Sequence, residues 1–149
     1  MRVVIQRVRE ATLSIGGERY SQIGKGLVVL VGVTHDDQQE DMEYLVQKLL
    51  KMRIFDDEAG VMNLDVQQVG GELMIVSQFT LMASTRKGNR PSYIAAAPEP
   101  IARPLYERFV ERVEELTDRK AATGQFGADM QVALVNDGPV TICVDSRNR

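Results

Sequence analysis

The feature that most constrains the fold is the run Leu-Val-Val-Leu-Val at residues 27–31. Every residue in it is apolar, so a strand formed here has no face suited to water. Strands that are buried on both faces lie in the middle of a sheet, not at its edge. We therefore predict a sheet in which this segment is a central strand.

The flanking segments predict further strands. Residues 2–15 are expected to form a long strand that turns at Gly16-Gly17, where glycine tolerates positive φ, and returns over residues 18–23. Residues 61–69 and 72–79 predict a second hairpin around Gly70-Gly71. A third is predicted near the C-terminus, with a turn at residues 136–139 between two alternating runs: Met130, Val132 and Leu134, then Val140, Ile142 and Val144.

Two segments have the spacing of helices that cover a sheet. The first, with Asp36 or Asp37 as its expected N-cap, has this apolar face: Met42, Leu45, Val46, Leu49 and Leu50. The second begins among three prolines and has this one: Ala102, Leu105, Tyr106, Phe109, Val110, Val113 and Leu116. Strands joined by hairpins and helices predict an α/β fold. We expect a single domain, residues 1–149, whose mixed, largely antiparallel sheet is covered by two main helices.

Composition limits the available chemistry. The chain has one histidine, His35, and one cysteine, Cys143, so neither a His/Cys zinc cluster nor an internal disulfide can form within it. We expect Cys143 in the core, no metal and no cofactor. A net charge of −3 does not favour a nucleic-acid partner by bulk electrostatics. Without a membrane-length apolar run or a signal-peptide cleavage region, the predicted location is the cytoplasm.

A polar cluster interrupts the apolar pattern at Ser77, Gln78 and Thr80, with Phe79 among them. It directly follows the core-like residues 73–76. Hydrogen-bonding side chains at the end of a buried strand need partners. The cluster is therefore either a strand end that surfaces into a loop or a site that meets a ligand, and these residues alone leave both interpretations open.

Two further stretches have alternative interpretations. Residues 136–141 contain Gly138-Pro139, which presents bare backbone and can adopt a cis bond at modest cost. This stretch is either an ordinary hairpin turn or the wall of a pocket. The loop at residues 83–93 carries three cations that either remain solvated or contact phosphate groups. These cations are Arg86, Lys87 and Arg90.

Taken together, these stretches resemble the D-aminoacyl-tRNA deacylases. The resemblance is carried by residues 1–8, 77–81, 87–92, 124–130 and 136–141. It implies a homodimeric, cytoplasmic proofreading hydrolase with no cofactor. Such an enzyme cleaves the ester between a D-amino acid, or glycine, and the 3′ end of a tRNA.

The resemblance also implies roles for individual residues. Ser77, Gln78, Phe79 and Thr80 would line the pocket for the terminal adenosine and the scissile ester. Gly138-Pro139, with a cis bond, would enter the pocket of the other subunit, hold the amino group and exclude an L side chain. The expected supporting residues are Arg7, Asn136 and Met130, and the expected tRNA contacts are Arg86, Lys87 and Arg90.

The catalytic step has two candidate mechanisms. Backbone N–H groups around Phe79 and Thr80 are candidates to stabilise the oxyanion of an already activated ester. Thr80 is a weak nucleophile without a base, so we expect the 2′-hydroxyl of the terminal ribose to assist a water molecule. Two alternative functions are a non-catalytic tRNA-binding or editing-type module, and an esterase that uses Ser77 with His35.

Overall fold

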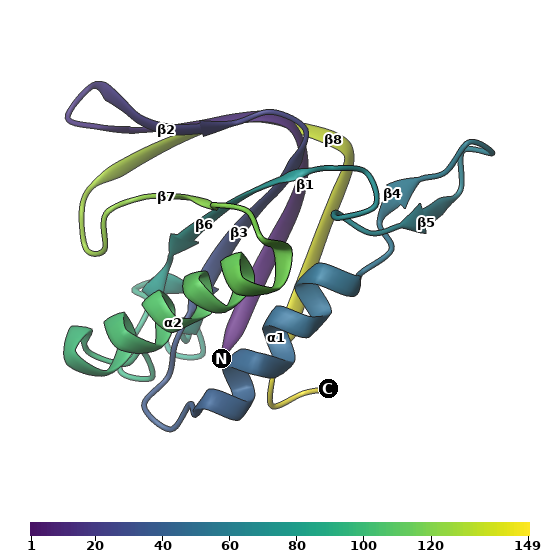
Figure 1. Cartoon of the computed structure of the whole chain (residues 1–149). Helices are drawn as coiled ribbons and strands as arrows, with labels where there is room; N and C mark the ends of the chain where they lie inside the picture. Colours follow the sequence, from purple (N-terminus) through teal and green to yellow (C-terminus); the bar gives the residue numbers. More distant parts are fainter.

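A twisted sheet forms the centre of the molecule, and both long helices lie on one of its faces (Figure 1). The computed structural model describes all residues from 1 to 149. The strands of this sheet are β1 (Arg2–Ile15), β2 (Glu18–Ile23), β3 (Gly26–Gly32), β6 (Glu72–Ser77), β7 (Ala122–Thr123) and β8 (Met130–Asp145). The helices are α1 (Gln39–Lys51) and α2 (Glu99–Thr117). Neither helix is long and apolar enough to span a bilayer.

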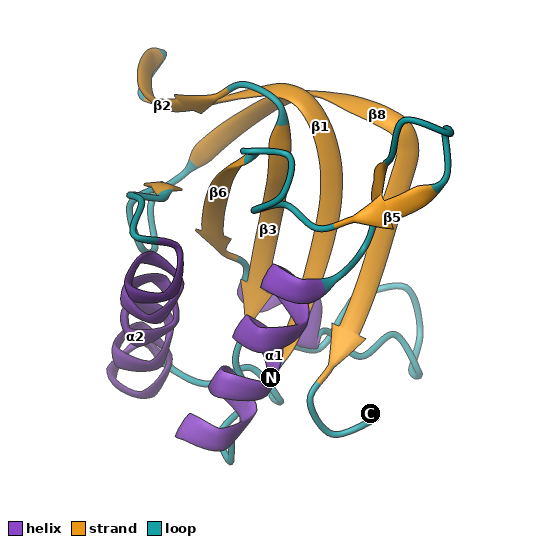
Figure 2. Cartoon of the chain, turned by 45° about the vertical axis from the view of Figure 1, so that its right-hand side comes forward, coloured by secondary structure: helices purple, strands orange, loops and turns teal.

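The sheet is mixed, and β1 pairs with three of its strands. β1 pairs antiparallel with β2, β3 and β8, whereas β3–β6 and β6–β7 are parallel pairs. The long strands β1 and β8 run side by side and bend together (Figure 2). The predicted mixed, largely antiparallel sheet with two main helices is confirmed.

The central strand β3 is buried on both faces, as its sequence predicts. Leu27 and Val29 belong to a core cluster of 22 residues that also contains the buried faces of α1 and α2. Val28 belongs to a second cluster of seven buried residues, which come from the strands alone. The bend of β1 and β8 provides the cover that this second face of β3 requires.

The predicted hairpin over residues 61–79 is wrong. β5 (Met62–Leu64) pairs with β4 (Phe55–Asp56) in a separate two-stranded ribbon, and β6 pairs in parallel with β3. β6 is buried at Leu73, Met74, Ile75 and Val76. A strand apolar on both faces is better accommodated inside the main sheet than in an exposed hairpin.

The predicted C-terminal hairpin is also wrong, because β8 is one continuous strand. Its two halves both pair with β1, so the chain does not reverse at Gly138. Instead, the register shifts between Gln6–Thr141 and Val8–Asn136. Arg7 therefore faces a bulge formed by residues 137–140.

Several smaller expectations are also corrected. Gln38 is the N-cap of α1, where its backbone and side chain form a capping box with Asp41. Cys143 is exposed on β8 and does not belong to the core. Leu116, at the end of the predicted apolar face of α2, is 38% exposed.

Candidate active site

The ends of β3 and β6 lead into a cavity of ≈ 460 Å³. Leu30 and Val76 line it from these two strands. The remaining walls come from the 3₁₀ helix η1 (Phe79–Met82), the beginning of α2, and residues 126–130. The predicted site residues Ser77, Gln78 and Phe79 line this cavity, so the polar strand end surfaces into a hollow in the molecule.

Main-chain bonds fix the polar end of β6. Ser77 pairs with Val31 of β3, and the Gln78 N–H donates to the Val31 carbonyl at 2.7 Å. The chain then turns into η1, and the Gln78 side-chain amide donates to Thr80 Oγ1 at 2.5 Å. Thr80 is half-buried and is not one of the residues that line the cavity. The Thr80 hydroxyl is therefore bound by Gln78, a residue of the same motif.

The start of η1 provides backbone donors beside the cavity. Its first turn is closed by the Leu81 N–H, which donates to the Gln78 carbonyl at 3.2 Å. The N–H groups of Phe79 and Thr80 lie ahead of this bond and have no acceptor within the helix. Phe79 is 56% exposed and meets the Tyr93 ring edge-on, with the centroids 5.2 Å apart.

The opposite wall is aromatic. The Tyr106 hydroxyl donates to the Ile75 carbonyl at 2.7 Å, and burial raises the pKa of this phenol above its ordinary value. Phe126 packs against Tyr106 with the ring centroids 5.9 Å apart. The guanidinium of Arg103 lies over the Phe126 ring, with its Cζ 5.3 Å from the ring centroid. The predicted supporting residue Met130 also lines the cavity.

Gly138 and Pro139 lie outside this cavity. Both are exposed, the peptide bond between them is cis, and Gly138 has φ +120°. Arg7, only 6% exposed, holds the bulge: its Nε donates to the Asp137 carbonyl at 3.1 Å and its Nη1 to the Ile54 carbonyl at 2.6 Å. One chain thus has two separate motifs, one inside the cavity and one presented on the surface.

The order and sequence of these motifs match known proteins. Residues 4–145 match the family model described as D-Tyr-tRNA(Tyr) deacylase. The chain is 54% identical to the D-aminoacyl-tRNA deacylase of Bacteroides thetaiotaomicron and 56% identical to that of Flavobacterium johnsoniae. Each alignment covers 149 residues, which is 100% of this chain and 99% of the relative. The chain belongs to the D-Tyr-tRNA(Tyr) deacylase family.

Two solved structures share the deacylase fold. One, titled "c-Myc DNA Unwinding Element Binding Protein", has a TM-score of 0.92 and 40% identity, covering 97% of this chain and 98% of that one. The other, titled "Structural Analysis of a probable eukaryotic D-amino acid tRNA deacylase", has a TM-score of 0.84 and 18% identity, covering 97% and 98% of the two chains. The predicted family and its enzyme class are confirmed.

The remaining residues proposed for the deacylase site lie on the surface. Asn136 is exposed where β8 pairs with Val8. Arg86, Lys87 and Arg90 are exposed, and none of them forms an ion pair or a side-chain hydrogen bond. Their loop is closed at its base by reciprocal backbone bonds between Ser84 and Ser92 at 2.8 and 2.9 Å.

The structure does not bring Ser77 and His35 together. Ser77 lines the cavity, whereas His35 is exposed and its Nε2 contacts the Ile94 carbonyl at 2.9 Å. This arrangement gives no support to an esterase built on that pair. No group of three or more His, Cys, Asp or Glu residues has the geometry of a metal site.

Sequence reasoning missed the contribution of α2 to the deacylase cavity. Glu99, Ala102 and Tyr106 line it, although only the packing face of this helix was identified. Only Tyr106 could have indicated this contribution from the sequence, because a buried tyrosine in an apolar face needs a partner for its hydroxyl. Nothing in the local pattern indicates that this partner lies on β6.

Proposed function

We propose that this chain hydrolyses the ester of D-aminoacyl-tRNA, releasing free tRNA and a D-amino acid. The observation that carries the proposal is the polar strand end of β6, where Ser77, Gln78 and Phe79 line a cavity and η1 begins. Membership of the deacylase family supplies the substrate class.

In this proposal the cavity holds the terminal adenosine and the scissile ester. The mainly apolar walls and the exposed Phe79 ring suit a base and a ribose. As the ester carbonyl becomes tetrahedral, the N–H groups of Phe79 and Thr80 stabilise the oxyanion. A single donor of this kind is typically worth about 3–4 kcal/mol, a substantial part of the barrier for an activated ester.

Water is the proposed nucleophile, assisted by the ribose 2′-hydroxyl. The Thr80 hydroxyl accepts the Gln78 bond, and His35, the one histidine, lies outside the cavity. Thr80 therefore lacks the adjacent base that activates a hydroxyl nucleophile. Attack by water on the ester carbon transfers the leaving electron pair to the ribose oxygen, which takes up a proton.

Chiral selection is assigned to Gly138-Pro139 from a second copy of the chain. This segment is exposed, is held by Arg7 and lies outside its own cavity, so it is available to a neighbour. Backbone without large side chains meets the amino group closely and excludes an L side chain by clash. Glycine has no side chain, so glycyl-tRNA is a proposed second substrate. The active form is a homodimer.

The acceptor stem is assigned to the basic loop. Arg86, Lys87 and Arg90 are exposed and unpaired, and Phe79 contacts Tyr93 where the loop returns. Contacts to phosphate position a nucleic acid without reading its sequence, which suits an enzyme that acts on many tRNAs. The proposed location is the cytoplasm, where aminoacyl-tRNA is made and used.

A second candidate is nucleic-acid binding without hydrolysis. The unpaired cations of the loop favour it, and one structural relative is titled a DNA unwinding element binding protein. The net charge of −3 limits such binding to this loop.

One assay separates the candidates. Purified protein is incubated with D-aminoacyl-tRNA, L-aminoacyl-tRNA, glycyl-tRNA and a simple aminoacyl ester, and release of the amino acid is followed. Turnover of the D and glycyl forms, with the L form intact, is the expected result. Binding of all tRNAs without release supports the second candidate, and hydrolysis of the simple ester at the same rate contradicts a tRNA deacylase.

A further inference from the structure

The 3₁₀ helix η1 is bound near its end by a side chain from β1, which lies two strands away from β6 in the sheet. The Nη1 of Arg2 donates to the Leu81 carbonyl at 2.8 Å. Arg2 is the one side chain outside residues 77–82 that forms a hydrogen bond to this segment. Residues 77–82 form the inward motif, and residues 136–140 form the outward motif.

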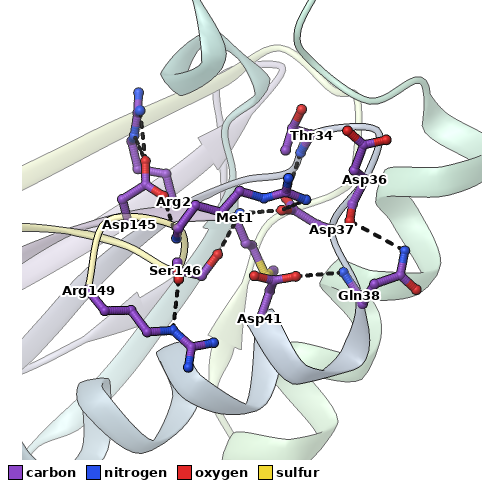
Figure 3. Close-up of polar contacts among 11 residues, drawn as sticks. Met1, Arg2, Thr34, Asp36, Asp37, Gln38, Asp41, Asp145, Ser146 and Arg149 are labelled. Atoms are coloured by element: carbon purple, nitrogen blue, oxygen red, sulfur yellow. Dashed lines mark hydrogen bonds and ion pairs between the residues drawn. The ribbon is translucent and has the colours of Figure 1, made fainter.

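The guanidinium of Arg2 is itself oriented by a carboxylate. Its Nε and Nη2 both donate to Asp145 Oδ2, at 3.1 and 2.8 Å, as Figure 3 shows. Burial raises the pKa of Asp145, but the Arg147 N–H and Arg2 hold it below its ordinary value, so the carboxylate is ionised at neutral pH. Because the guanidinium is a rigid plane, binding Asp145 on one edge directs the remaining nitrogen at Leu81.

Arg2 and Asp145 belong to a row of residues that crosses three neighbouring strands. Arg2 is paired with Asp145 of β8 on one side and with Gly32 of β3 on the other. Residues directly opposite each other on antiparallel strands project from the same face of a sheet. The Arg2 side chain therefore extends over the face on which Gly32 leaves open space.

Gly32 allows η1 to lie close to the sheet. A methyl group added at Gly32 would be 2.9 Å from Leu81 Cβ and 3.2 Å from the Gln78 carbonyl oxygen, which is too close for ordinary packing. The backbone of β3 is thus in direct contact with η1. The segment is supported by β3, bound at its start through the Gln78 N–H and bound near its end by Arg2.

We propose that Arg2 is a positioning residue for the deacylase reaction and that Asp145 orients it for this role. The inference rests on the proposed function, in which the Phe79 and Thr80 N–H groups stabilise the oxyanion. Both donors immediately precede Leu81, whose carbonyl Arg2 binds. Oxyanion donors act only when they point at the developing charge, so a displaced η1 would weaken the transition state more than the bound substrate.

The role of Arg2 is indirect. Neither Arg2 nor Asp145 lines the cavity, and the Arg2 side chain is 42% exposed. An ion pair with this much exposure stabilises a protein little, so its loss should affect the rate more than the stability. β1 then carries the support of both motifs, with Arg2 bound to the inward motif and Arg7 bound to the outward one.

The first test measures kcat and KM for D-aminoacyl-tRNA with Arg2→Met, which keeps an apolar stem but removes every donor. We expect kcat to fall by about 10- to 100-fold, because misplaced catalytic groups lose rate on this scale. KM should change by less than about twofold, since the bound substrate does not use the oxyanion donors. An unchanged kcat, or a loss confined to KM, in the presence of an active parent protein would overturn the proposal. An inactive parent would instead contradict the proposed function itself.

Arg112→Met is the matched control for the loss of an arginine–carboxylate pair. Arg112 joins α2 to α1 through Glu43 at 2.8 Å, also pairs with Glu115, and does not contact the inward motif. This variant should lower the Tm at least as much as Arg2→Met but leave kcat unchanged. Equal losses of kcat in the two variants would trace the effect to stability and overturn the proposal.

The role of Asp145 is tested by a double-mutant cycle. Asp145→Asn should lower kcat by less than Arg2→Met does, because Arg2 keeps its donors and loses only their orientation. The double variant should have the kcat of Arg2→Met alone, since Asp145 acts through Arg2. Losses that multiply in the double variant would show that the two residues act separately and would overturn this part of the proposal.

Amide hydrogen exchange tests the position of η1 without relying on turnover. The Leu81 N–H donates to the Gln78 carbonyl at 3.2 Å and closes the first turn of η1. It should exchange faster in Arg2→Met than in the parent protein or in Arg112→Met, because the end of η1 is no longer bound. Equal exchange in all three proteins would overturn the proposal.

Discussion

The two polar motifs of this chain are built in opposite ways. Residues 77–79 follow a central strand, bind β3 through the main chain and line a cavity. Residues 136–140 bulge outward from an edge strand, with Gly138 and Pro139 exposed and Arg7 as their buried support. In the proposed function the first motif supplies the pocket, and the second, which lies outside the pocket of its own chain, supplies the wall that selects for chirality. This difference supports a site completed by a second copy.

The largest effect is expected from Gly138→Ala. A methyl group here would lie 2.9 Å from Val140 Cγ2 and 3.0 Å from Arg7 Nη2, at a φ of +120° that L residues rarely adopt. We expect deacylation of D-aminoacyl-tRNA to fall by about 100-fold or more, equivalent to about 2.7 kcal/mol in kcat/KM. Kinetics with D- and L-substrates measure this.

Gly60→Ala is the matched control for backbone strain. Gly60 also has positive φ, +75°, but an added methyl group would meet nothing within 4 Å. Gly60→Ala should lower the stability of the protein but leave kcat/KM unchanged. If Gly138→Ala behaves like Gly60→Ala and keeps its D-over-L selectivity, the outward motif has no role in the reaction.

The support of the outward motif is tested by Arg7→Lys. Lysine keeps the charge but lacks the planar group that reaches both the Asp137 and Ile54 carbonyls. The loss of a buried, charge-assisted bond costs about 1.5–3 kcal/mol, so we expect a Tm lower by several degrees together with at least a tenfold loss of activity. Arg9→Lys, at a 75% exposed side chain that also pairs with Asp137, should change neither measurement.

The inward motif should be less sensitive at its hydroxyl. Thr80→Val keeps the shape of the side chain and removes the acceptor for Gln78. If water is the nucleophile, single-turnover rates should fall by less than about tenfold, because only the orientation of Gln78 is affected. A loss of a thousandfold or more with tRNA binding intact would instead make Thr80 the nucleophile.

The smallest effect is expected at the basic loop. Each phosphate contact contributes roughly 0.7–0.9 log units of affinity per decade of salt. Lys87→Ala should lower the slope of log KM against log salt by about one contact and leave kcat unchanged. Lys51→Ala, an exposed lysine at the end of α1, serves as the control. Equal slopes in all three proteins would remove the loop from the tRNA interface.

Local patterns predicted the elements better than their partners. The run at residues 27–31, the first hairpin and the buried face of α1 were all predictable, because burial periodicity is written in neighbouring residues. The partner of β6 was not, since β3 is separated from it by α1 and the β4–β5 ribbon. Gly138-Pro139 has the composition of a turn, and only the pairing of both halves of β8 with β1 identifies it as a bulge.

The candidate site was also only partly predictable from local sequence patterns. Its polar strand end could be predicted because three hydrogen-bonding side chains after a core strand are unusual. The wall from α2 and Phe126 could not, since those residues become neighbours of Ser77 only through packing.

The most direct test of a composite site is complementation between two inactive variants. Phe79→Pro removes an N–H donor and the exposed ring from the inward motif, at the first position of η1 where proline is tolerated. Gly138→Ala impairs the outward motif. Each variant should be nearly inactive alone. After the subunits are mixed and exchanged, half of a statistical dimer population is hybrid and each hybrid has one intact site, so about a quarter of the parent activity should return. Turnover of D-aminoacyl-tRNA at that level is the predicted result. A mixture no more active than its two components would contradict a site shared between copies.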